Sequence, residues 1–186
     1  MLRVIGGTAG GRKLNTVKGT STRPTSGRVK EALFSMLAFR INGSEVLDLF
    51  AGTGSLGIEA LSRGAGRAVF IDKSAGCCSV IRKNLANTGF EERAEVYSMD
   101  FSEGIKFLSR EGRKFDLVFV DPPYSKNFIE ETLNLLEKND IIKNGGIIAV
   151  EHQKSDSLPE RCGGLKVVDS RKYGDTMITI YNMAKI

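Results

Sequence analysis

The sequence is poor in the residues that mark disulfide-bonded and metal-binding chains. Its 186 residues include three cysteines, one histidine and no tryptophan. Cys77 and Cys78 are adjacent and Cys162 is distant, so there is neither a C-x-x-C pair nor an even disulfide framework. His152 is the only histidine. We therefore predict reduced cysteines and no metal site.

Long apolar runs are also missing. No stretch approaches the ~20 apolar residues that span a bilayer. Glycines 6, 7, 10 and 11 interrupt the segment where a signal peptide would carry its apolar core. Hydrophobic residues make up 41% of the chain and charged residues 26%, a balance typical of globular proteins. We expect a cytoplasmic protein that contacts no membrane.

Acidic residues are almost absent from the first 40 positions. This segment holds eight basic residues and one acidic residue, a net charge of +7, whereas the other 146 residues hold 19 basic and 21 acidic residues, a net charge of −2. Such an excess produces a positive field suited to phosphate backbones. The alternative is a solvated basic edge without a partner. The candidates for RNA contact are Arg12, Lys13, Lys18, Arg28 and Lys30.

Short apolar runs alternate with amphipathic segments from residue 45 onward. The expected strands are 45–49, 68–72, 95–99, 115–120 and 146–151, and the expected helices are 56–63, 74–88, 102–110 and 127–138. Two more strand-like runs, 165–171 and 177–182, close the chain. This order predicts an α/β fold, a doubly wound and mostly parallel sheet with a C-terminal antiparallel hairpin.

The basic segment precedes this pattern. Residues 2–5 and 12–14, with glycines between them, predict a short β-hairpin. Apolar residues at helical spacing then predict a helix over about 26–39, capped by Thr25 or Ser26. We divide the chain into a basic N-terminal extension, residues 1–40, and one α/β domain, residues 41–186.

The first strand of this domain runs into a glycine-rich loop. Gly52, Gly54 and Gly57 match G-x-G-x-x-G, and Asp72 ends the next strand. This pattern fits a dinucleotide-binding fold, whose acid holds ribose hydroxyls, or a helix start that only packs closely. Asp48 argues against the dinucleotide, because a carboxylate just before the loop would repel a pyrophosphate at the helix N-terminus.

S-Adenosylmethionine fits the same loop better, since it has a ribose and an adenine but no phosphate. Asp48 would attract its ammonium group, Asp100 would accept from the adenine amine, and Phe101 would pack on the adenine face. Asp100 has an alternative role as the cap of the following helix. The complete predicted cofactor set from this reasoning is Asp48, Gly52, Gly54, Asp72, Lys73, Asp100 and Phe101.

The fourth strand ends in Asp121-Pro122-Pro123-Tyr124. Ligands of open α/β sheets bind outside the carboxyl ends of the strands, where this corner lies. The exocyclic amine of a nucleic-acid base is a poor nucleophile because its lone pair is delocalised into the ring. The Asp121 carboxylate and the Pro122 carbonyl can accept its two N–H groups, and Tyr124 can stack on an extruded base. The corner predicts methyl transfer to such an amine, and an ordinary rigid strand end is the alternative.

With these motifs the chain resembles the RsmD family of bacterial ribosomal RNA methyltransferases over essentially its whole length. The matching stretches are 3–7, 11–14, 22–26, 28–34, 48–57, 59–65, 121–124 and 173–176. The Asp-Pro-Pro-Tyr corner is shared by many amino-methyltransferases, so the N-terminal motifs give most of the specificity for this family.

The resemblance implies a Rossmann-like class I methyltransferase that makes N2-methylguanine in 16S ribosomal RNA of the small subunit. It also implies that Arg23 and Thr25 lie near the methionine end of the cofactor. Gly27 departs from the family, which often has Asp there. The substrate is then 16S rRNA, free or within an assembled or assembling 30S particle, and we expect a monomer.

Three other classes share part of these features. A DNA adenine-N6 methyltransferase has both core motifs but normally carries a larger target-recognition region. A nicotinamide-dependent oxidoreductase would explain the glycine loop and Asp72, but not the corner at Asp121. A noncatalytic RNA-binding domain would explain the basic segment alone.

Overall fold

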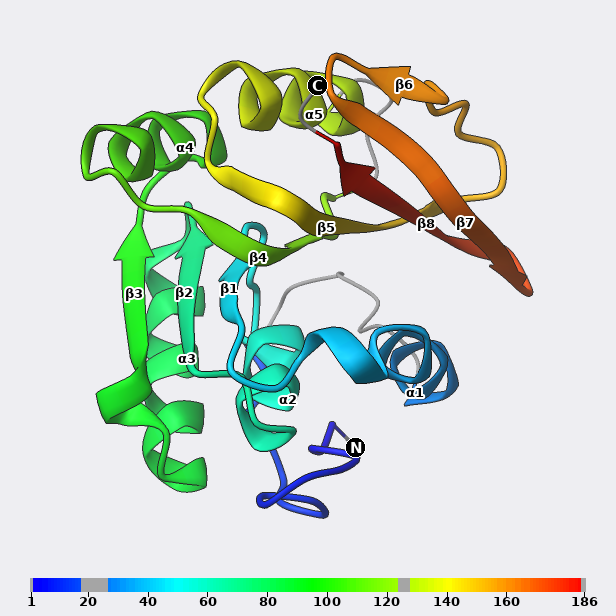
Figure 1. Cartoon of the computed structure of the whole chain (residues 1–186). Coiled ribbons are helices and arrows are strands. Elements are labelled where there is room, and N and C mark those ends of the chain that lie inside the picture. The colour runs from blue at the N-terminus through cyan, green and yellow to red at the C-terminus, as the bar shows by residue number, and fades with distance from the viewer. Residues whose placement is uncertain (1, 18–26, 124–127, 185–186) are drawn as a thin grey trace.

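The computed structural model describes residues 2–17, 27–123 and 128–184. Within these ranges, eight strands form one mixed sheet in the order β3-β2-β1-β4-β5-β8-β7-β6 (Figure 1). Neighbouring strands are parallel from β3 to β5, and the pairs β5–β8, β8–β7 and β7–β6 are antiparallel. The strands are β1 Glu45–Asp48, β2 Arg67–Asp72, β3 Ala94–Ser98, β4 Phe115–Val120, β5 Ile142–Gln153, β6 Arg161–Cys162, β7 Leu165–Tyr173 and β8 Thr176–Met183. The predicted doubly wound sheet with its C-terminal hairpin is confirmed.

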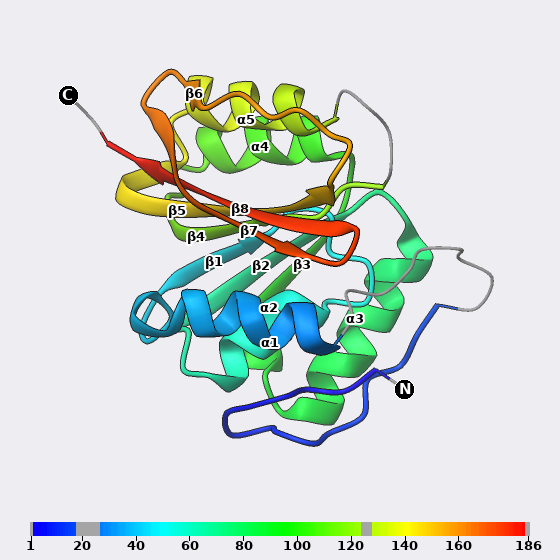
Figure 2. The same cartoon turned by 90° about the vertical axis from the view of Figure 1, so that its right-hand side faces the viewer.

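Helices cover both faces of this sheet. Figure 2 shows α4 and α5 on one face and α1, α2 and α3 on the other. Each face has its own buried apolar cluster. The helices are α1 Gly27–Met36, α2 Ser55–Ser62, α3 Ala75–Thr88, α4 Phe101–Arg110 and α5 Phe128–Lys138, with 3-10 turns at Ala38–Arg40 and Glu91–Arg93. Across the described part of the chain, none of them has the length and apolar character that crossing a membrane would take.

Local sequence signals explain where the α3 helix begins and ends. The Ser74 hydroxyl accepts a hydrogen bond from the backbone N–H of Cys77, which satisfies one of the free donors at the start of the helix. Gly89 follows the last turn with φ 76°, the left-handed conformation in which glycine is favoured.

Two predicted segments of the N-terminal extension differ from the structure, and in the sheet β5 is longer than the predicted 146–151 and β6 was not predicted. The α1 helix ends at Met36 rather than near residue 39, because the chain tightens there into the 3-10 turn Ala38–Arg40. Its proposed caps, Thr25 and Ser26, lie outside the described residues. The N-terminal hairpin contains a single bridge between Arg3 and Lys13, so it is a β-like loop rather than a pair of strands.

The basic extension is packed on the α/β domain. Val4 and Leu14 are buried in the same apolar cluster as residues of α1, α2 and β1. The backbone N–H groups of Ile5 and Gly6 donate to the Glu59 carboxylate in α2, over 2.7 and 2.8 Å. The two predicted segments of the chain therefore share one core.

Candidate active site

Acidic side chains gather where the parallel strands end. Asp48 and Asp72 are the last residues of β1 and β2, Asp121 directly follows β4, and Glu151 lies near the end of β5. These strands are parallel, so their carboxyl ends lie at one edge of the sheet. This is the edge at which open α/β sheets bind their ligands.

The glycine loop between β1 and α2 contains two residues in the left-handed conformation. Gly52 has φ 55° and Gly54 has φ 76°, and Gly54 is the N-cap of α2. Gly57 is required for another reason, because a Cβ there would lie 2.3 Å from the Phe70 ring of β2. The glycines thus allow the left-handed turns of this loop and let α2 pack tightly on the sheet.

Asp48 lies beneath this loop and is 2% exposed. Its carboxylate accepts a hydrogen bond from the Gly57 N–H over 2.9 Å. Burial, together with a smaller effect of the Asp72 charge, raises the pKa of Asp48 to about 7, against the lowering effect of the Gly57 N–H. A cation placed beside Asp48 would favour its ionised form. This fits the predicted contact with an ammonium group, which stays a prediction.

Backbone donors orient the Asp72 carboxylate. One oxygen accepts from Gly52 N–H and the other from Ser74 N–H, each over 2.8 Å. A carboxylate oxygen can accept more than one hydrogen bond, so these contacts leave capacity for ribose hydroxyls. Lys73, beside it in the sequence, is exposed. The donor and acceptor chemistry around the loop therefore fits the predicted cofactor.

The structure gives Asp100 and Phe101 clear structural roles. An Asp100 oxygen accepts from both the N–H and the hydroxyl of Ser102 over 2.9 Å, so Asp100 caps α4, as the alternative interpretation predicted. Phe101 is 6% exposed, and its ring centroid lies 5.1 Å from that of Phe50 and 5.7 Å from that of Phe128. Phe50 was not predicted from the sequence. The adenine contacts stay predictions.

A hollow opens beside the Asp-Pro-Pro corner. Its described lining comes from the end of β4, the start of α5, the end of β5 and the turn into β8, and consists of Asp121, Pro122, Pro123, Ile129, Glu151, His152, Asp156 and Thr176. Tyr124, the predicted stacking residue, lies outside the described residues. The other three residues of the predicted catalytic corner all border this hollow.

His152 is buried in the wall of the hollow with both ring nitrogens engaged. Nε2 lies 2.8 Å from the Thr179 hydroxyl, and Nδ1 lies 2.9 Å from the Gln153 carbonyl oxygen. Burial lowers the pKa of His152, and the Gln153 carbonyl and Asp156 oppose that shift. The sequence-based prediction that His152 is dispensable for chemistry agrees with this structural arrangement but is not tested by it.

One predicted RNA contact is wrong. Lys30 is 1% exposed, and its Nζ donates to the Arg3 carbonyl over 2.8 Å and to the Ser55 hydroxyl over 2.9 Å. The same nitrogen lies 3.3 Å from Glu59, which is fully buried. Burial lowers the pKa of Lys30, and Glu59 opposes this. Lys30 ties α1 to the N-terminal loop and to the start of α2, and cannot reach an RNA phosphate.

The other predicted RNA contacts lie at different places. Arg28 is exposed in the first turn of α1, and Figure 2 shows this end of α1 on the same side of the molecule as the carboxyl ends of the strands. Arg12 and Lys13 are also exposed, but the Arg12 guanidinium donates to the carbonyl of Asn87 in the last turn of α3. That end of α3 is far from the catalytic edge, because the helix starts just after β2 and runs back. The remaining predicted RNA contact, Lys18, and the predicted cofactor contacts Arg23 and Thr25 lie outside the described residues.

Comparison with known proteins gives consistent matches over nearly the whole chain. The family model described as Conserved hypothetical protein 95 matches residues 2–182. The chain is 37% identical to the putative rRNA methyltransferase YlbH of Bacillus subtilis, covering 97% of this chain and 98% of that protein. It is 41% identical to ribosomal RNA small subunit methyltransferase D of Escherichia coli, covering 85% of this chain and 78% of that protein. A solved structure titled putative methyltransferase yhhF from Escherichia coli has a TM-score of 0.87 and 34% identity, covering 100% of this chain and 99% of that one.

Proposed function

The chain belongs to the RsmD family of ribosomal RNA methyltransferases, and on that basis we propose that it methylates the exocyclic N2 amine of one guanine in 16S ribosomal RNA. The observation that supports this reaction most directly is the Asp121-Pro122-Pro123 corner, which borders a hollow at the carboxyl edge of the sheet. The oriented carboxylate of Asp72 belongs to the same edge.

S-Adenosylmethionine, when bound, supplies a methyl group on a cationic sulfonium. The residues that would hold it are the backbone of Gly52 and Gly54, the Asp72 carboxylate toward the ribose, and Asp48 toward the ammonium group. Asp48 and Asp72 are both held by backbone N–H donors of the loop and helix around them. Their positions are therefore set before any ligand arrives, which lowers the entropic cost of binding.

Asp121 and Pro122 would act on the guanine amine. The carboxylate of Asp121 and the carbonyl of Pro122 accept one N–H each, which favours a tetrahedral nitrogen whose lone pair points toward the methyl group. Proline is suited to this position because it offers no competing N–H donor. The contribution of these residues is positioning and electrostatic stabilisation, without a covalent intermediate.

The substrate must present guanine N2, which lies on the minor-groove edge, to this hollow. A loop or an extruded nucleotide does so most readily. Exposed Arg28 at the start of α1 is available to hold the backbone near the site. We extend the proposal to a monomeric cytoplasmic enzyme acting on 16S rRNA, either free or within an assembled or assembling 30S particle.

A reconstitution experiment tests the function. Ribosomal RNA from a strain lacking the gene is incubated, free or in small subunits, with the protein and S-adenosylmethionine, and mass spectrometry of nuclease fragments maps any new N2-methylguanine. Duplex DNA in a parallel reaction tests the adenine-N6 alternative. Methylation of adenine in DNA, with none in ribosomal RNA, would contradict the proposal.

The variant Asp121→Ala tests the role of the corner in this assay. We expect methyl transfer to fall by about 100- to 1,000-fold, as when one preorganised transition-state contact is removed. Binding of S-adenosylhomocysteine, measured by calorimetry, should stay within about twofold of wild type, because the loop residues are unchanged. Near-normal turnover in the variant would remove Asp121 from the reaction.

A further inference from the structure

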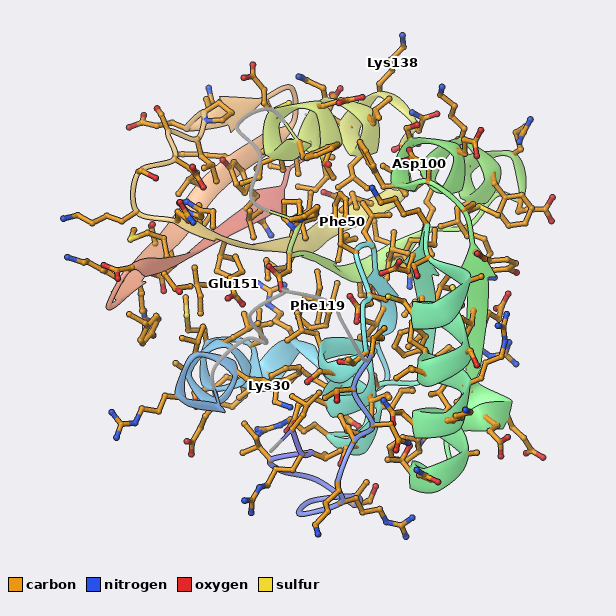
Figure 3. All side chains as sticks on the ribbon, turned by 180° about the vertical axis from the view of Figure 1, so that it is seen from behind. Lys30, Phe50, Asp100, Phe119, Lys138 and Glu151 are labelled. Atoms are coloured by element: carbon orange, nitrogen blue, oxygen red, sulfur yellow. The ribbon has the colours of Figure 1, made fainter. Side chains whose placement is uncertain are left out.

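The hollow beside the corner contains a second carboxylate to which the proposed reaction gives no role. Val120 of β4 pairs in register with Val150 of β5, so Asp121 and Glu151 are the next residues along two neighbouring parallel strands. Both side chains are partly exposed and both border the hollow. Figure 3 shows Glu151, together with Phe119, on the side of the sheet that faces α1.

Glu151 lies beside another carboxylate of the hollow, that of Asp121. Two carboxylates on neighbouring strands repel one another. The third acid of the hollow, Asp156, has a local role, because its carboxylate accepts the Gln153 N–H over 2.9 Å in the turn that follows β5. Glu151 instead belongs to the regular pairing of β5 with β8, where it lies opposite Ile178.

The paired acceptors match one purine better than the others. Guanine presents two adjacent donors on its Watson–Crick edge, the N1–H and the N2 amine. Adenine presents an amine beside N1, which is an acceptor. An extruded base is read through hydrogen bonds to this edge. A carboxylate next to the one that accepts a hydrogen bond from the N2 amine therefore attracts the N1–H of guanine. It repels the N1 lone pair of any purine that lacks this proton.

We propose that Glu151 selects guanine by accepting its N1–H, while Asp121 accepts from the N2 amine that is methylated. This inference rests on the proposed function, since it assigns a specificity residue to the same hollow. Glu151 contacts the substrate edge without taking part in methyl transfer.

The test compares guanine with 2-aminopurine at the mapped target position. 2-Aminopurine keeps the amine on C2 but has an acceptor at N1. The RNA is used in whichever form, free fragment or reconstituted small subunit, the wild-type enzyme methylates. Wild type should prefer guanine by at least about 100-fold in kcat/KM, because sites built around a substrate N–H reject analogues that lack it.

The variant Glu151→Gln keeps the shape of the side chain and can either accept from N1–H or donate to an N1 acceptor. We expect guanine methylation to fall by about 10- to 100-fold and the guanine preference to fall by at least about 10-fold, because the amide fits both bases. 2-Aminopurine also lacks the guanine O6, but this difference is the same for both enzymes and cancels in the comparison of their preferences.

Glu160→Gln is the matched control, since Glu160 is exposed, precedes β6 and is not part of the hollow. It removes the same charge and should keep the wild-type preference. Binding of S-adenosylhomocysteine checks that each variant is folded. An unchanged preference in Glu151→Gln would overturn the assignment of Glu151. Failure of wild type to methylate guanine N2 at all would instead overturn the proposed function, so the two failures are distinguishable.

Discussion

Replacing Lys30 should destabilise the protein rather than weaken its contact with RNA. In Lys30→Met the aliphatic part of the side chain is kept, but the Nζ bonds to the Arg3 carbonyl and the Ser55 hydroxyl are removed. Glu59, which is fully buried, loses its partner at 3.3 Å. Removing one member of a buried ion pair costs about 3–5 kcal/mol, because the other charge stays buried.

Glu59 keeps three other donors, the N–H groups of Ile5 and Gly6 and the Arg63 guanidinium, so we expect the lower part of this range. For a protein of this size, each kcal/mol lowers Tm by ~2–4 °C, so a loss of about 3 kcal/mol corresponds to a decrease of ~6–12 °C. Thermal unfolding followed by circular dichroism measures it.

Arg28→Met on the same helix is the matched control. Arg28 is exposed, and its replacement should change the free energy of unfolding by less than about 0.5 kcal/mol while weakening RNA binding. The reasoning would be refuted by a Lys30→Met protein of wild-type Tm with reduced RNA affinity, since this pattern would mean that Lys30 is accessible to phosphate.

Three further predictions concern the cofactor and the RNA. Asp72→Ala should weaken binding of S-adenosylmethionine by about 1.5–3 kcal/mol for each ribose hydroxyl that no longer has its acceptor, and unchanged affinity in calorimetry would place the ribose elsewhere. Because the pKa of Asp48 is raised to about 7, protonation of Asp48 stabilises the folded state. This contribution is complete below pH ~4, the ordinary pKa of Asp, and disappears as pH rises through about 7. Denaturant unfolding should therefore give a lower free energy of unfolding at pH ~8 than at pH ~5, and Asp48→Asn should abolish this difference. Neutralising Arg12, Lys13 and Lys18 together should lower the slope of log affinity for RNA against log salt concentration by roughly 0.7–0.9 for each phosphate contact that is lost, and should leave cofactor affinity unchanged. Identical slopes for wild type and variant would mean that these basic residues contact solvent rather than RNA.

The sequence was sufficient to predict most of the sheet because most of its strands contain apolar runs between turn residues, whereas the two-residue β6 strand has no such run and was not predicted. Phe115–Val120 was predicted with the bounds that the structure shows, and the carboxyl-edge positions of Asp48, Asp72 and Asp121 followed from the parallel order. Contacts between distant segments carry no such periodic signal. Lys30 was predicted as a surface residue, because nothing in its neighbourhood shows that Glu59 will lie beside it.

Glu151 and Phe50 were missed for different reasons. Glu151 ends the predicted fifth strand, so the rule that ligands bind at the carboxyl ends of strands could have identified it. Phe50 lies in the glycine loop, where it reads as part of a motif, and only the fold brings it to Phe101 and Phe128. The position of Glu151 was therefore within reach of sequence reasoning, whereas the contacts of Phe50, which join a loop to two separate helices, were not.

The placement of positive charge bears on the size of the RNA that is recognised. The Arg12 guanidinium is hydrogen-bonded to the carbonyl of Asn87, near the end of α3. The same helix begins just after Asp72, at the catalytic edge of the sheet. Its 14 residues span about 20 Å at ~1.5 Å per residue. An RNA that reaches both the hollow and Arg12 must extend over this distance, well beyond one extruded nucleotide. Arg28, at the start of α1, can contact the phosphates next to the target nucleotide, so loss of Arg28 should lower turnover of any RNA substrate. Loss of Arg12 and Lys13 should lower turnover only for an RNA that is folded or assembled enough to span the molecule.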